Sequence, residues 1–291
     1  MFLAASTLLA LGLLAGAPHA TAAPEAGKTI EKIKADGRLI VGIGQEAAPF
    51  GYRENGQLVG YDVDIVRAVA KRLETYIGSP ISLQFMAVTD ETRISWVQSG
   101  QVHMSLSHTN ITRKRLANID FSVPYGWDGK SILYRNTKPP RDLADFAGKT
   151  IGIKRSSSAE GEIKAYFESK GLAPPVLKQY DNHGAGIRAL LDQQIDGFTD
   201  DSSLIIATAT LSGSKVGPDG PLSVAATSYS TAMFGIGVPQ DDSRWRNIVN
   251  YALHDLWLSG EFQRIYAKWF GPASVCPLPL GDHRMEPFVN G

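Results

Sequence analysis

The chain has 291 residues, with 29 lysine and arginine residues against 29 aspartate and glutamate residues, and 43% of its residues are hydrophobic. This apolar share is typical of globular proteins and excludes a disordered or fibrous chain. The formal net charge of zero argues against a partner held by bulk electrostatics, such as nucleic acid or an acidic membrane. A single cysteine excludes an intrachain disulfide and a multi-thiolate metal cluster.

The N-terminal segment has the pattern of a signal peptide. Residues 2–17 carry no charge, and small residues follow them up to Ala23. This apolar run is too short for a comfortable bilayer span, so we expect residues 1–22 to be a signal peptide, cleaved after Ala22 or Ala23, and the mature protein to be exported. No cysteine lies near the cleavage site, which argues against a lipid anchor. No basic residue precedes the run, which leaves the natural start of the gene product open.

Apolar strands alternate with amphipathic helices along the rest of the chain. Strands are expected at 38–43, 58–59, 81–88, 102–107, 131–134, 150–153, 195–199 and 233–238. Helices are expected at 30–36, 62–77, 92–98, 112–118, 159–170, 187–191, 201–211, 243–253 and 255–270. This alternation indicates an α/β fold. The pattern pauses at the polar, proline-rich segment 136–141 and then restarts, which suggests two lobes with the second inserted in the first.

Familiar catalytic and cofactor motifs are absent from the sequence. It contains no GxSxG, HExxH, P-loop or GxGxxG pattern, and its six histidines show no metal-ligand spacing. We therefore expect no cofactor, no bound metal and no catalytic residue.

Polar side chains follow three of the predicted strands, where open α/β sheets place ligand sites. They are Ser107, His108 and Asn110, then Lys154, Ser157 and Ser158, then Asp200 and Asp201. Arg115 follows Asn110 by five residues, and a guanidinium can hold a carboxylate by two parallel hydrogen bonds. Taken singly, each group is better explained as a helix cap or a solvated turn than as part of a ligand site.

Several motifs, taken in order, resemble the periplasmic amino-acid-binding proteins of ABC uptake systems, solute-binding protein family 3. They are FGYRENGQLVGYDVDI at 50–65, TRKR at 112–115, IDFS at 119–122, DFAGKTIG at 145–152, IDGF at 195–198, FGIGV at 234–238 and KWFG at 268–271. Together the motifs cover most of the chain after the leader.

The resemblance implies a two-lobed fold of the type II periplasmic-binding-protein kind, which closes on its ligand. Lobe 1 would comprise residues 28–133 and 232–271, lobe 2 residues 134–231, and residues 272–291 would form a C-terminal tail. The three prolines between 272 and 279 exclude a helix at the start of this tail.

The resemblance also assigns roles to the polar groups. Arg115 would clamp the α-carboxylate of an amino acid and Asp201 would take its α-ammonium. The first-lobe segment would line the pocket, and the second-lobe loop would complete it on closure. These two sets are Ser107, His108 and Asn110, and Lys154, Ser157 and Ser158.

Segment 88–94 resembles the branch of the family that binds acidic and other polar amino acids, and it would make Arg93 the partner of the ligand's side chain. Gly44 and Ala47 depart from this pattern, because relatives often carry a charged and an aromatic residue there. We expect a monomer that delivers glutamate, aspartate or another polar amino acid to an ABC permease in the inner membrane.

Two other functions stay open at this point. Periplasmic cyclohexadienyl dehydratases resemble these binding proteins, and Glu46 or Glu160 would then have to supply a general acid, although no local motif marks either residue. A sensory module would instead present the same ligand to a membrane receptor.

Overall fold

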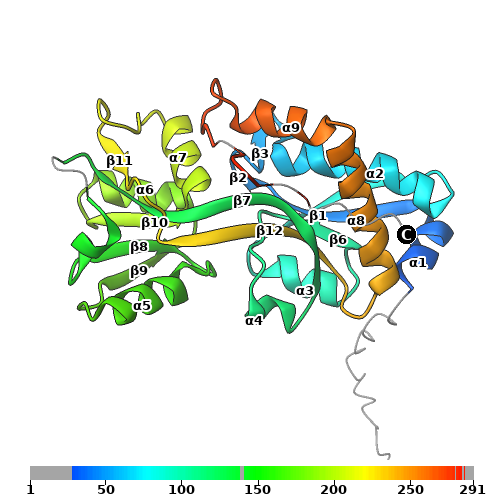
Figure 1. Ribbon diagram of the computed structural model, residues 1–291, viewed down its shortest axis with the longest axis horizontal. Helices are drawn as coiled ribbons and strands as arrows, with labels where there is room; N and C mark the ends of the chain where they lie inside the picture. Colours follow the sequence, from blue (N-terminus) through cyan, green and yellow to red (C-terminus); the bar gives the residue numbers. More distant parts are fainter. Residues whose placement is uncertain (1–27, 138–140, 279, 284, 286–291) are drawn as a thin grey trace, which may run out of the picture.

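The computed structural model describes residues 28–137, 141–278, 280–283 and 285 (Figure 1). The predicted signal peptide, residues 1–22, lies outside the described residues. The strands are β1 (Arg38–Gly44), β2 (Glu46–Ala47), β3 (Gly51–Glu54), β4 (Gln57–Val59), β5 (Ser82–Val88), β6 (Met104–Leu106), β7 (Asp120–Arg135), β8 (Thr150–Lys154), β9 (Val176–Tyr180), β10 (Gly197–Asp201), β11 (Leu222–Val224) and β12 (Ser230–Val238). The helices are α1 (Thr29–Asp36), α2 (Tyr61–Ile77), α3 (Thr92–Gln98), α4 (Arg113–Leu116), the 3-10 turn η1 (Leu143–Phe146), α5 (Ala159–Lys170), α6 (His183–Leu191), α7 (Ser202–Leu211), α8 (Ser243–Leu258) and α9 (Glu261–Phe270).

One nine-stranded sheet passes through both halves of the molecule. Its order is β5-β1-β6-β12-β7-β10-β8-β9, with β11 paired to β7. The outer strands of each half pair in parallel, as expected for strands joined through helices, whereas β7 and β12 pair antiparallel. These two strands cross from one half to the other (Figure 1). The chain therefore leaves lobe 1 along β7 and returns along β12, and the second lobe is inserted in the first, as predicted.

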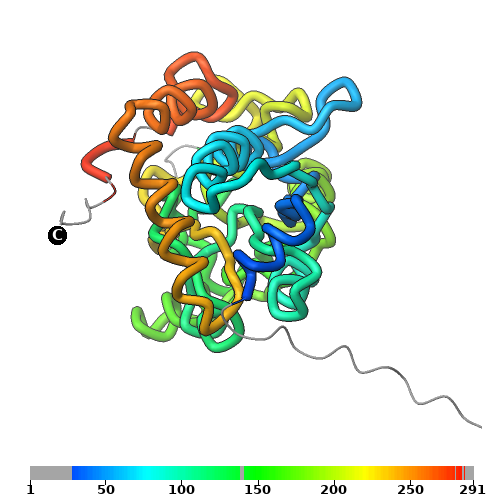
Figure 2. Tube along the Cα trace, turned by 90° about the vertical axis from the view of Figure 1, so that its right-hand side faces the viewer, coloured from blue at the N-terminus to red at the C-terminus, as the bar shows by residue number. Residues whose placement is uncertain are grey.

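The two lobes have separate apolar cores. The lobe 1 core gathers large buried side chains from α2, α8 and α9, including Tyr61, Trp245 and Phe262. Tyr76 of α2 donates a hydrogen bond to Asp255 of α8, so these helices lie side by side despite their distance in sequence (Figure 2). The helix α2 is amphipathic and ends at Gly78, whose left-handed conformation (φ 74°) suits glycine.

The second lobe buries side chains on both faces of its part of the sheet. Ile132 of β7 packs in a cluster with Phe146 and Phe167, whereas the next residue, Leu133, packs with Phe198. Successive strand residues point to opposite faces of the sheet, so the two clusters lie on opposite faces. The first cluster is covered by α5, and the second is covered by α6 and α7. The lobe boundaries stay a prediction, but this packing favours a boundary a few residues before 133.

Several elements differ from the sequence-based expectation. The strand expected at 131–134 is the C-terminal part of β7, which begins at Asp120 and includes Pro124. Proline is tolerated there because the β7–β12 register shifts on both sides of Gly235, the residue opposite Pro124. The break expected after residue 253 lies instead at Ser259 and Gly260, where φ is 72° at the glycine. The strands β2, β3, β9 and β11 were not predicted, and the edge strand β9 has a mostly exposed pattern.

The described part of the tail packs against lobe 1 and contains no helix or strand. Leu278 and Leu280 contact the lobe 1 core, and the ring of His283 stacks on Trp127 of β7 with 5.4 Å between centroids. Cys276 is 1% exposed, and burial, aided by Asp128, raises the pKa of its thiol to about 12. Within the described residues, no helix is both long enough and apolar enough to span a bilayer.

Replacement of Trp245 tests how much the lobe 1 core contributes to stability. Trp245 is fully buried, and its indole N–H donates to the carbonyl of His103 at 2.9 Å. We expect Trp245→Ala to lower the free energy of unfolding by about 3–5 kcal/mol, because it leaves a cavity and an unpaired carbonyl. Leu258→Ala, at a 66% exposed position of the same helix, should change it by less than about 0.5 kcal/mol. Urea unfolding followed by circular dichroism measures both, and equal losses would contradict the assignment.

Candidate functional site

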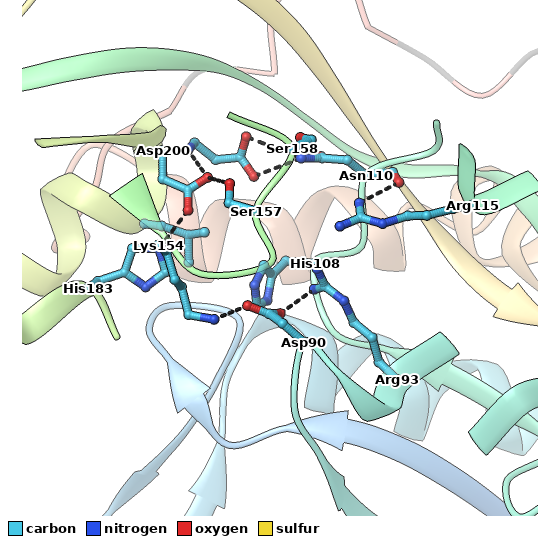
Figure 3. A pocket seen from close by; sticks show the side chains of 12 residues that line it. Asp90, Arg93, His108, Asn110, Arg115, Lys154, Ser157, Ser158, His183 and Asp200 are labelled. Carbon is cyan, nitrogen blue, oxygen red and sulfur yellow. Dashed lines mark hydrogen bonds and ion pairs between the residues drawn. The ribbon is translucent and has the colours of Figure 1, made fainter. Parts of the chain in front are cut away.

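A polar pocket lies where the two lobes face each other (Figure 3). Lobe 1 contributes Asp90, Arg93, His108, Asn110 and Arg115, and lobe 2 contributes Lys154, Ser157, Ser158, His183, Asp200, Asp201 and Leu204. Leu204 is the one apolar side chain in this lining, so the pocket is built for a charged or hydrogen-bonding ligand.

The loop after β6 brings His108 and Asn110 into the pocket. His108 has a left-handed backbone conformation (φ 38°), which is strained for a residue with a side chain. Its N–H donates to Asp62 Oδ2 at 2.9 Å, and Tyr125 donates to the other oxygen of Asp62 at 2.8 Å. Burial raises the pKa of Asp62 to about 7 although both hydrogen bonds oppose this. Asp62 thus holds the strained turn from beneath the pocket.

Arg115 enters the pocket from α4, and Thr112 caps this short helix by accepting a hydrogen bond from the Arg115 N–H at 3.3 Å. The Arg115 guanidinium donates to the carbonyl of Asn110 at 2.9 Å. Among the residues that the structure describes, no carboxylate lies within ion-pair distance of it. Burial, together with the nearby charge of Arg93, lowers the pKa of Arg115 to about 10. A largely buried cation of this kind is stabilised by an anion.

Arg93, at the start of α3, is paired with Asp90 in the preceding turn. Arg93 Nη1 lies 2.8 Å from Asp90 Oδ1 and also donates to the carbonyl of Ser107 at 2.7 Å. The second oxygen of Asp90 accepts a hydrogen bond from Lys154 of the opposite lobe. Burial lowers the pKa of Arg93 to about 10. Ser107 therefore acts through its backbone, as a support for Arg93, and its side chain does not line the pocket.

Two adjacent carboxylates end β10, and a buried lysine of β7 neutralises one of their charges. The antiparallel register sets Lys130 opposite Asp201. Lys130 Nζ lies 2.7 Å from Asp201 and 3.1 Å from Asp200, and the lysine is 1% exposed. Burial alone would lower the pKa of Lys130, but the two carboxylates raise it above its usual value.

The two carboxylates have different surroundings. Asp200 accepts hydrogen bonds from Ser157 at 3.1 Å and lies 3.0 Å from His183 Nε2. Burial would raise the pKa of Asp200, but Lys130 and His183 hold it well below its usual value. Burial raises the pKa of Asp201 to about 6. Asp201 makes no side-chain cap on α7 and instead accepts a hydrogen bond from Asn110 across the lobes at 3.2 Å.

Four buried polar atoms of the pocket have no hydrogen-bond partner among the described residues. They are Arg93 Nε, His108 Nδ1, Asn110 Oδ1 and Ser158 Oγ. Buried polar groups in native proteins are nearly always paired, so a cluster of unpaired donors and acceptors indicates where a ligand binds. His108 is neutral here, because burial and Arg93 hold its pKa well below the usual value.

The residues expected from the sequence lie together, with the exception of the Ser107 side chain; their roles in binding stay a prediction. The sequence analysis did not single out Asp90, Lys130 or His183. Asp90 lies inside the segment 88–94 that identified Arg93, so a signal was present. Lys130 and His183 reach the site through the β7–β10 pairing and the placement of α6, which no local pattern predicts.

The two candidate general acids lie elsewhere. Glu46 is exposed on β2, and Glu160 is a surface residue paired with Lys164 at 2.7 Å. The Lys164 hydrogen bond lowers the pKa of Glu160, whereas a general acid needs a raised one. Neither residue lines the pocket. Over the described ranges, no group of three or more histidine, cysteine, aspartate or glutamate side chains is arranged to hold a metal ion.

Comparison with known proteins agrees with this architecture. The chain is 27% identical over 270 residues to an L-glutamate/L-aspartate-binding protein of Pseudomonas aeruginosa, covering 91% of this chain and 88% of that one. It is 25% identical over 276 residues to the ABC transporter glutamine-binding protein GlnH of Bacillus subtilis, covering 92% of this chain and 95% of that one. Among solved structures, an ancestral arginine-binding protein bound to arginine matches with a TM-score of 0.69 and 28% identity, covering 81% and 99%.

The family model for bacterial extracellular solute-binding proteins, family 3, matches residues 39–272. This range includes β7, β12 and every residue that lines the pocket. The chain therefore belongs to the bacterial extracellular solute-binding proteins of family 3.

Proposed function

We propose that this protein captures a free amino acid between its two lobes in the periplasm and delivers it to an ABC permease. The observation that carries the proposal is the state of Arg115, a largely buried cation without a carboxylate partner among the described residues, in a pocket whose other wall carries Asp201. The names of the relatives support the ligand class and the ABC partner.

The charges around Arg115 and Asp201, at one end of the pocket, match a zwitterion. Arg115 and Lys130 together carry two positive charges, and Asp200 and Asp201 carry two negative charges, so the end is neutral. A bound α-carboxylate on Arg115 and an α-ammonium on Asp201 keep it neutral and pair both charges of the ligand. Such pairing is required because an unpaired buried charge is costly. The free oxygen of Asn110 is a further acceptor for the ammonium.

The part of the pocket around Arg93 and His108 favours a polar side chain. Arg93 retains an unpartnered Nε, and His108 a neutral, unpartnered Nδ1. An apolar side chain would leave both groups buried without a hydrogen bond, at a cost of about 1–3 kcal/mol each. We therefore favour glutamate, aspartate or another polar amino acid. Binding is favoured over a dehydratase activity, because the two candidate acids, Glu46 and Glu160, lie outside the pocket.

The first experiment is thermal unfolding of the mature protein against the twenty amino acids, with prephenate and arogenate included. The protein is first denatured and refolded to remove retained ligand. A ligand that binds only the folded state adds about 2.7 kcal/mol of stability at a hundredfold excess over its dissociation constant. We expect a polar amino acid to raise the midpoint. If none does and prephenate is converted to an aromatic product, the protein is an enzyme.

Arg115→Ala tests the carboxylate clamp. We expect it to weaken binding of the amino acid found in that screen by about 2–5 kcal/mol, because a buried carboxylate loses its cation. Arg113→Ala, two residues earlier on the exposed side of α4, removes the same charge outside the pocket and should leave affinity nearly unchanged. Isothermal titration calorimetry distinguishes the two, and an unchanged affinity in Arg115→Ala would show that the clamp lies elsewhere.

Lys130→Met tests the buried charge cluster. Removing one partner from a buried ion pair costs about 3–5 kcal/mol, and here it leaves two adjacent carboxylates without their cation. The pKa values of both carboxyls in the folded protein then rise. Raising the pH ionises these carboxyls in a buried site, so the folded protein becomes less stable as pH increases. The deficit in free energy of unfolding should therefore be largest near pH 8 and shrink towards pH 5. Lys164→Met, in an exposed pair, should cost less than about 1 kcal/mol at both pH values. A deficit independent of pH would refute the charge argument.

A further inference from the structure

Asp90 occupies an unexpected position at the side-chain end of the pocket. Its side chain is 7% exposed and lies between two cations, Arg93 of its own lobe and Lys154 of the other (Figure 3). A binding site for an anionic group would ordinarily lack a carboxylate of its own, because like charges in a buried site repel. The role of Asp90 therefore requires an explanation.

The net charge around Arg93 and Lys154 explains the presence of Asp90. Arg93 and Lys154 carry two positive charges that face each other across the lobes, and Asp90 cancels one of them. The end is left with one positive charge, whereas the Arg115 end is neutral. A zwitterion with a neutral side chain leaves this charge unpaired, and a basic side chain adds a second one. A single side-chain carboxylate brings the whole pocket to zero.

Arg93 and Lys154 still have N–H groups that can donate hydrogen bonds to a ligand carboxylate. Asp90 engages Nη1 of Arg93 and one N–H of Lys154, while Arg93 Nε is buried without a partner and an ammonium has three donors. The neutral His108 lies beside them, as Figure 3 shows. A ligand carboxylate can therefore bind next to Asp90 without displacing it from both cations.

We propose that Asp90 is an internal counter-anion that sets the side-chain specificity of this pocket. It holds Arg93 and Lys154 together across the lobes and leaves one unit of positive charge, which selects an amino acid with one side-chain carboxylate. The proposal rests on the proposed function, since it assumes an amino acid with its α-carboxylate on Arg115.

The test compares L-glutamate with L-glutamine, which differ by one charge and have nearly the same shape. Isothermal titration calorimetry gives the affinity ratio of the two for the parent and for Asp90→Asn. We expect the parent to prefer glutamate. We expect Asp90→Asn to raise the glutamate-to-glutamine ratio by about tenfold or more, because a second unpaired positive charge then faces the ligand. A ratio removes any effect of the variant on lobe closure, since closure affects both ligands alike.

Glu91→Gln is the matched control. Glu91 is adjacent to Asp90 and also contacts the other lobe, through Ser156 at 3.2 Å, but it is exposed and does not line the pocket. The charge of Glu91 also acts on Arg93, but solvent screens it, so Glu91→Gln should change the ratio far less than Asp90→Asn does. Lys154→Met changes the net charge in the opposite direction, and it replaces Asp90→Asn as the test if that variant does not fold. It removes the remaining positive charge, so the ratio should fall.

Two results overturn the inference alone. One is a parent that binds glutamine more tightly than glutamate, and the other is an unchanged ratio in Asp90→Asn or, if that variant does not fold, in Lys154→Met. A parent that binds neither of these, nor any other amino acid in the thermal screen, overturns the proposed function and this inference with it. The thermal screen thus separates failure of the specificity argument from failure of the ligand class.

Discussion

The antiparallel pairing of β7 with β12 is the constraint on which the rest of the molecule depends. Each lobe builds its own core, and these two strands carry the chain between the cores as part of one sheet. Because β7 also pairs with β10, the carboxylates that end β10 lie beside the strand that links the lobes. The strand that connects the lobes therefore also holds the carboxylates of the pocket in place.

The pocket balances its charges with counter-ions from the protein itself. Lys130 reduces the charge of the Asp200–Asp201 pair, and Asp90 reduces that of Arg93 and Lys154. Two adjacent carboxylates, or two facing cations, would otherwise be forced to change protonation state in a site this buried. With both counter-ions present, the end at Arg115 and Asp201 matches a zwitterion, and the end at Arg93 and Lys154 matches one further negative charge. Charge matching of this kind favours selectivity as much as affinity.

Much of the fold follows from local sequence patterns, and the exceptions have physical reasons. The helices predicted at 92–98 and 159–170 are α3 and α5, with the bounds that the structure has. The full extent of β7 could not be predicted, because Pro124 fits a strand only where the register with β12 shifts. The site was located by the order of motifs along the chain, which brought Arg115 and Asp201 into one hypothesis. Lys130 needed the β7–β10 register, a long-range property that no window of residues contains.

The environment of Cys276 has a practical consequence for following lobe motion in solution. This residue is the sole cysteine of the chain, it is 1% exposed, and its raised pKa of about 12 keeps the sulfur protonated at neutral pH. Only the thiolate reacts readily with maleimides, so the native sulfur is a poor target for dyes. A cysteine introduced on the surface of either lobe would be the one reactive thiol. The molecule is thus ready for site-specific fluorescent labelling without removal of its own cysteine.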